Sequence, residues 1–209
     1  MNLYQLTVAG LTLGFCGCAA TSLKQTWKSP SYQGGPVQKV AVLVVDERDL
    51  YRQSIENHFA GLLNQQGQGA LATYKLLSLP AIKADKQAAV ARVREAGADS
   101  VLIVRLVDRD TSANEVRATP AVYAPTLSGY ESGDWYSYYS VAFMDMGTVW
   151  GNTKMEIYLE SSLYELKSGK RIWSGLTRTT LKESGDRVAE ITPLAAKVFA
   201  AMRKDGMLR

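Results

Sequence analysis

Residues 37–45 read VQKVAVLVV, and this stretch decides the fold class. The run becomes continuously apolar and β-branched, which is typical of a strand covered on both faces, as in a parallel sheet. Four charged residues, 46–49, then end the run and can cap a helix. The next apolar residues recur at three- and four-residue spacings and predict one buried helix face: Leu50, Tyr51, Ile55, Phe59, Leu62 and Leu63.

The alternation of strand and helix continues along the chain. Residues 71–77 (LATYKLL) predict a second strand, residues 83–96 an Ala-rich helix, and residues 100–107 (SVLIVRLV) a third strand. Right-handed crossovers place such strands parallel to one another with helices against the sheet. The first half of the chain therefore predicts a βαβαβ unit.

The carboxy-terminal part has a different pattern. Residues 153–166 and 171–181 alternate like strands, and Ser168-Gly169 between them predicts a hairpin turn. Residues 185–204 predict a last helix, in which Pro193 delays the start or kinks the axis. We expect an α/β fold: a βαβαβ parallel core extended by an antiparallel C-terminal hairpin and a final helix, as a two-layer or three-layer sandwich.

Composition predicts one domain and no nucleic-acid partner. The 209 residues are 46% hydrophobic, enough for one well-buried core. We expect residues 37–209 to form a single α/β domain with an aromatic, Gly-rich insertion at about 109–151. The net charge of +4 comes from Lys and Arg interleaved with Asp and Glu. Without a basic run, this pattern favours a solvated surface over a nucleic-acid site.

The amino-terminal segment has the pattern of an export signal. Residues 6–15 are largely apolar, the length of a signal-peptide core and too short to span a bilayer as a helix. Only the free amino terminus supplies positive charge before this run, since no Lys or Arg precedes it. Cys16 and Cys18 are the only cysteines of the chain, which excludes a disulfide framework or a cysteine zinc cluster elsewhere.

Residues 13–20 (LGFCGCAA) resemble the lipobox of bacterial lipoproteins, although Phe15 and Cys16 depart from its usual residues. The resemblance implies that residues 1–17 are a signal peptide and that Cys18 is the lipid attachment site, carrying fatty chains such as palmitate. Ala19 stands where the resemblance associates Asp with inner-membrane retention, so the outer membrane is favoured. The alternatives are a signal cleaved without lipidation and an apolar helix packed on the domain.

Residues 18–36 are predicted to be a lipidated linker. They are polar, interrupted by Pro30, and end in a Gly-Gly-Pro sequence, which is typical of a spacer. Trp27 and Tyr32 lie inside it and either dock onto the domain or sit at the lipid interface; docking is favoured.

Three phrases carry a resemblance over about residues 37–204: KVAVLVV, GADSVLIVRL and LYELKSGKRIWSG. Their order resembles the α/β domain of curli-secretion lipoproteins, of penicillin-binding-protein activator lipoproteins, and of the amino-terminal part of the Tol-system propeller protein. A nearer resemblance is to uncharacterised bacterial envelope lipoproteins of similar layout, which supply no activity to carry over.

Candidate catalytic chemistry is sparse. The single histidine, His58, is predicted to be a surface or boundary residue, and no GxSxG motif surrounds a serine. Two carboxylate pairs follow the first and third strands, where a cluster could hold Mg²⁺: Asp46 and Glu47, and Asp108 and Asp110. Arginines are interspersed among these carboxylates, and acidic residues at strand ends often only cap helices and solubilise loops. We therefore expect no catalytic, cofactor-binding or metal-binding residues.

Residues 121–151 are rich in aromatic side chains, which are costly to expose. The candidate interaction residues are Trp135, Tyr136, Tyr138, Tyr139, Phe143 and Trp150. They are interpreted as a platform for a protein partner or a glycan. The alternatives are a hairpin that touches the membrane or oligomerises, and a long loop folded onto its own sheet.

We therefore expect a periplasm-facing lipoprotein that acts as a non-enzymatic accessory or assembly factor through protein contacts. Its expected partners are the membrane, through the lipid anchor, and an envelope protein; association into a homo-oligomer is left open. One alternative is a binding module for cell-wall glycan or another envelope ligand. Another is a metal-dependent enzyme that uses the strand-end carboxylates.

Overall fold

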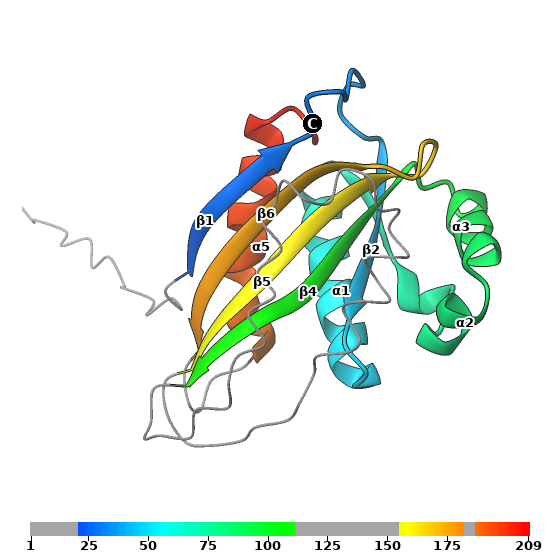
Figure 1. Ribbon diagram of the computed structural model, residues 1–209. Coiled ribbons are helices and arrows are strands. Elements are labelled where there is room, and N and C mark those ends of the chain that lie inside the picture. The colour runs from blue at the N-terminus through cyan, green and yellow to red at the C-terminus, as the bar shows by residue number, and fades with distance from the viewer. Residues whose placement is uncertain (1–20, 112–154, 182–186) are drawn as a thin grey trace, which may run out of the picture.

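The computed structural model describes residues 21–111, 155–181 and 187–209 (Figure 1). In chain order, the elements are β1 (Thr21–Lys28), β2 (Lys39–Val45), α1 (Asp49–Gln65), β3 (Gly69–Ala72), the 3₁₀ helix η1 (Thr73–Lys75), α2 (Leu79–Ala84), α3 (Lys86–Glu95), β4 (Ser100–Thr111), β5 (Met155–Glu165), β6 (Arg171–Leu181) and α5 (Arg187–Lys204). In these ranges, no helix is both long enough and apolar enough to cross a membrane.

The strands form one six-stranded sheet in the order β1-β6-β5-β4-β2-β3. Strand β2 pairs in parallel with β3 on one side and with β4 on the other. Strands β4, β5, β6 and β1 then pair antiparallel in succession. The predicted α/β fold is confirmed: a βαβαβ parallel core, an antiparallel hairpin turning at Ser168-Gly169, and a final helix.

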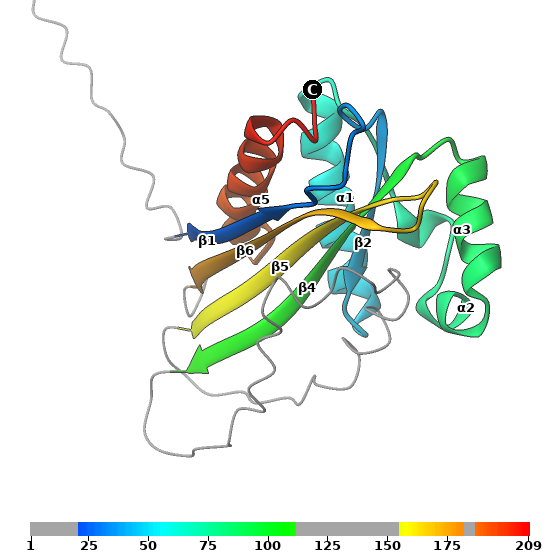
Figure 2. The same cartoon turned by 45° about the horizontal axis from the view of Figure 1, so that its top comes forward.

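Helices cover the two faces of the sheet unequally. Val42 and Val44 of β2 face the core shared with α1 and α5, whereas Ala41 and Leu43 face the core shared with α2 and α3. This is why the run that forms β2 is apolar at every position. Figures 1 and 2 show α1 and α5 along one side of the sheet, while α2 and α3 lie beside the β2 end only. Among the described elements, the sandwich has three layers around β2 and two around β6 and β1.

Strand β1 is the main difference from the sequence-based expectation. Residues 18–36 are predicted to be a linker, yet Thr21–Lys28 pairs antiparallel with β6 and forms the edge of the sheet. Residues 24–26 are exposed, so the strand has the polar composition of a spacer. Polar side chains, Lys in particular, are common on edge strands because they discourage pairing with another chain. Among the described residues, the sheet therefore already begins at Thr21.

Other boundaries shift for local reasons. The second predicted strand is shorter, because the chain turns into η1 at Thr73. The helix predicted at 83–96 is two helices, since the Asp85 side chain accepts a hydrogen bond from the backbone N–H of Ala88 and begins α3. The first residues of the predicted insertion, 109–111, are the last residues of β4.

Trp173 anchors β6 in the core and requires a glycine beside it. Its side chain is fully buried, and its indole N–H donates to Asp205 Oδ2 at 2.7 Å. A Cβ atom on Gly175 would lie 2.5 Å from the Trp173 ring, closer than any real contact. The ring therefore occupies the space that a side chain at position 175 would need.

Gly175→Ala is expected to lower the free energy of unfolding by about 2 kcal/mol, because a fully buried ring has little room to move aside. Gly61→Ala is the matched control, since a Cβ atom at that helical position meets nothing within 4 Å. The control is expected to raise stability by about 0.5–1 kcal/mol. Urea unfolding of both variants tests this; equal effects would contradict the packing argument.

Candidate functional site

The carboxyl end of β2 is where α/β proteins usually place a ligand site, and its charges are paired with each other here. Arg48 donates to Asp46 from Nε at 2.9 Å and from Nη2 at 2.7 Å, and this bonding raises the pKa of the Arg48 guanidinium. The same guanidinium lies 4.3 Å from the centre of the Tyr51 ring. Glu47 is exposed, with Lys83 Nζ 3.8 Å from its carboxylate.

The second pair of predicted carboxylates lies farther along the sheet. Val45, the last residue of β2, pairs with Arg105 of β4. Asp108 follows Arg105 by three residues, so its backbone lies roughly 10 Å beyond the end of β2. There β4 pairs with β5 alone, Asp108 opposite Tyr158. The described part of the chain contains no group of three or more His, Cys, Asp or Glu side chains able to hold a metal ion.

Behind this edge lies a buried ion pair that the sequence pattern does not predict. Arg52 and Glu56 of α1 are 2% and 0% exposed, and Arg52 Nε lies 2.8 Å from Glu56 Oε1. The predicted apolar face is therefore wrong at its start, where Leu50 is 80% exposed instead. Helical spacing assigns charged residues to solvent unless a partner distant in sequence is known.

Those distant partners come from β2, from η1 and from the loop that follows η1. The Glu56 carboxylate accepts hydrogen bonds from the backbone N–H of Val44 at 3.1 Å and of Tyr74 at 2.6 Å, and from the Thr73 hydroxyl at 3.0 Å. Arg52 Nη2 donates to the carbonyl oxygen of Leu77 at 3.0 Å. Burial raises the pKa of Glu56, while Arg52 and the two backbone N–H groups oppose that rise. The arrangement joins α1 to β2 and η1.

A second polar cluster links the four antiparallel strands. Glu160 of β5 is 5% exposed and lies between Arg105 of β4, at 2.8 Å, and Arg171 of β6, at 3.6 Å. The Ser162 hydroxyl also donates to Glu160, at 3.1 Å. The Arg171 guanidinium lies 5.0 Å from the ring centre of Trp27 on β1, which confirms that Trp27 docks on the domain.

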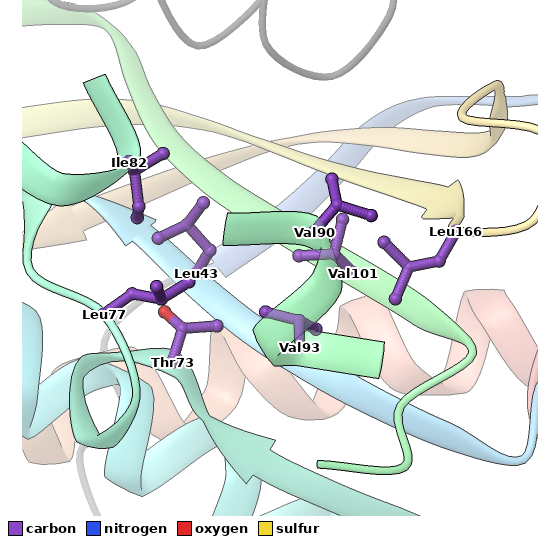
Figure 3. A pocket seen from close by; sticks show the side chains of 8 residues that line it. All are labelled: Leu43, Thr73, Leu77, Ile82, Val90, Val93, Val101 and Leu166. Carbon is purple, nitrogen blue, oxygen red and sulfur yellow. The ribbon is translucent and has the colours of Figure 1, made fainter. Parts of the chain in front are cut away.

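The layer between the sheet and α3 contains a small apolar pocket (Figure 3). Its volume is ≈ 10 Å³, about the minimum that one water molecule needs. It is lined by Leu43, Thr73, Leu77, Ile82, Val90, Val93, Val101 and Leu166. Ligand sites are usually larger by more than an order of magnitude, so this pocket is a packing gap.

The single histidine lies on the seam between α1 and α5. His58 Nε2 is 2.8 Å from the Thr192 hydroxyl, and the side chain is half-buried, as predicted for a boundary residue. Next to it, the rings of Phe59 and Phe199 meet edge to face at 5.6 Å. These contacts give His58 a role in helix packing.

The predicted lipid attachment site and the candidate aromatic residues lie outside the described residues. This holds for Cys18 and for the six candidate interaction residues between Trp135 and Trp150. The structure therefore gives only the points where these segments join the sheet: Thr21 for the amino-terminal segment, and Thr111 and Met155 for the aromatic one.

No protein-family model matches the chain, and no curated protein matches its sequence. The fold is that of a mixed α/β protein, and some solved structures are remotely similar to it. The PelC dodecamer from Paraburkholderia phytofirmans has a TM-score of 0.44 and 15% identity, covering 91% of this chain and 99% of that one. A variant of that dodecamer has a TM-score of 0.44 and 17% identity, covering 87% of this chain and 96% of that one.

A third similar structure is lipoprotein GNA1162 from Neisseria meningitidis, with a TM-score of 0.33 and 12% identity. The match covers 80% of this chain and 96% of the GNA1162 chain. Likenesses this remote transfer neither an activity nor an assembly to this chain.

Glu56→Ala is expected to lower the free energy of unfolding by about 3–5 kcal/mol, because it leaves the buried Arg52 cation without its counter-ion. Glu47→Ala is the control: it removes an exposed carboxylate and is expected to change stability by less than about 0.5 kcal/mol. Urea unfolding near neutral pH distinguishes the two. A loss below about 1 kcal/mol for Glu56→Ala would show that Arg52 finds another partner.

Proposed function

We propose that this chain is an envelope protein tethered by lipid at Cys18, acting as a non-enzymatic accessory or assembly factor through protein contacts. One observation carries the proposal: the Gly17-Cys18 junction follows an apolar run of signal-peptide length, with only Cys16 between them. Several acyl chains on one cysteine hold a protein to a membrane far more firmly than one. Ala19 after the cysteine favours the outer membrane, with the domain facing the periplasm.

The described residues support contact over catalysis. Asp46, Glu56 and Glu160 all engage cations of the same fold. Carboxylates that are paired with cations of the fold in this way are poorly placed to take or give protons, because a general acid or base must lie within hydrogen-bond reach of the substrate. The pocket between the sheet and α3 has room for about one water molecule.

Cys18→Ser is expected to abolish acylation and release the protein from the membrane fraction. Cys16→Ser is the matched control, because that thiol lies in the segment that processing removes. Metabolic labelling with a palmitate analogue, followed by fractionation of the envelope, measures both properties. Label on the Cys18→Ser protein, or no label on the natural chain, would contradict lipidation at Cys18.

An accessory role predicts that a second envelope protein co-purifies with the chain after crosslinking in intact cells. Deleting residues 121–151 is expected to abolish that co-purification while leaving Cys18 acylated, because the deletion removes all six candidate aromatic residues. The glycan alternative predicts a different result: the chain sediments with purified cell wall, and Trp135→Ala abolishes sedimentation. Crosslinking that is unchanged by the deletion would contradict a role for the aromatic segment.

A further inference from the structure

The chain between the proposed lipid site and the sheet is short. Only Ala19 and Ala20 separate Cys18 from Thr21, where β1 begins. Even fully extended, three residue steps span at most about 11 Å. If Cys18 is acylated, as proposed above, the beginning of β1 must lie within about that distance of the lipid headgroups.

The beginning of β1 is fixed within the fold. Thr21 is 8% exposed, and its hydroxyl lies 3.0 Å from that of Thr179 on β6. The pairing continues across the sheet, from Thr179 to Ile157 on β5 and from Ile157 to Arg109 on β4. The tether is therefore attached to one end of the four-stranded ladder formed by β1, β6, β5 and β4, and these strands move together as one unit.

The other end of the ladder is far from this row. Strands β5 and β6 are joined by the turn at Ser168-Gly169, ten residues along the chain from Thr179. At about 3.3 Å per residue, the turn lies roughly 30 Å from the row that contains Thr21. A tether of about 11 Å is much shorter than the ladder, so the two ends cannot exchange places at the membrane.

We infer that the lipid bilayer surface contacts the end of the sheet formed by the start of β1, the end of β6, the start of β5 and the end of β4. The strands of the ladder lead away from the bilayer, and the Ser168-Gly169 turn is the membrane-distal tip. The lipid headgroup layer contacts this end of the sheet, because only two residues separate Cys18 from β1. This orientation rests on the proposed lipid anchor at Cys18, and it adds which end of the domain faces the membrane.

Fluorescence quenching on the full-length, lipidated protein in liposomes tests the orientation. Single cysteines replace two exposed residues, Lys24→Cys near the start of β1 and Ser168→Cys at the distal turn, and each carries the same fluorophore. Lipids with a nitroxide on the headgroup act as the quencher. Because the sites differ by more than 20 Å in depth, roughly, the label at position 24 is expected to be quenched at least about threefold more strongly.

The control inserts sixteen Gly and Ser residues between Ala20 and Thr21. Such a spacer has a mean reach of about 22 Å and frees the domain to tumble, so the difference between the two labels is expected to disappear. A difference that survives the insertion would overturn the short tether as its cause.

Mass spectrometry of Cys18 in the same samples separates the two proposals. An unmodified Cys18 overturns the lipid anchor itself. An acylated Cys18 with equal quenching at both positions leaves the anchor standing and overturns the orientation, because the ladder would then lie flat on the bilayer. Stronger quenching at position 168 overturns it as well, because the ladder would then point the other way.

Discussion

The pairing of β1 with β6 is the constraint on which the proposed position of the domain at a membrane depends. Eight residues that have the composition of a spacer form the sheet edge instead, because β6 offers a free row of backbone donors and acceptors. The ring of Trp27 packs on the Arg171 guanidinium, which in turn lies beside Glu160. These contacts join this edge to the centre of the sheet. Without that pairing, the folded domain would follow a long flexible tether.

Buried ions fix the contacts between elements elsewhere in the fold. A buried pair such as Arg52 and Glu56 contributes little net stability, since removing two charges from water offsets most of their attraction. Its position matters more: the Glu56 carboxylate binds backbone groups of β2 and of η1 from its place on α1. Any shift of α1 along the sheet would leave buried donors without acceptors, at about 1–3 kcal/mol each.

The sequence was informative where a residue's environment depends on its neighbours along the chain. Strand β2 has solvent on neither face, so its apolar run is unambiguous, and Ser168-Gly169 supplies the turn, with Gly169 at a φ of 71°. Strand β1 could not be predicted, because exposed Lys24 and its neighbours resemble a linker. The buried Glu56 could not be predicted either, because its partners on β2 and η1, Val44 and Tyr74, stand 12 and 18 residues away in the chain.

The end of the sheet that would face the bilayer is also the end at which α/β proteins usually bind ligands, since β2 and β4 both run toward it. In this fold, β4 continues past β2 as a partner of β5, and Asp46 beside it is neutralised by Arg48. If Cys18 is acylated as proposed, a soluble substrate would have to enter between this edge and a membrane within about 11 Å of Thr21. On that proposal, a surface in this position would be reached more easily by membrane-bound neighbours than by soluble molecules.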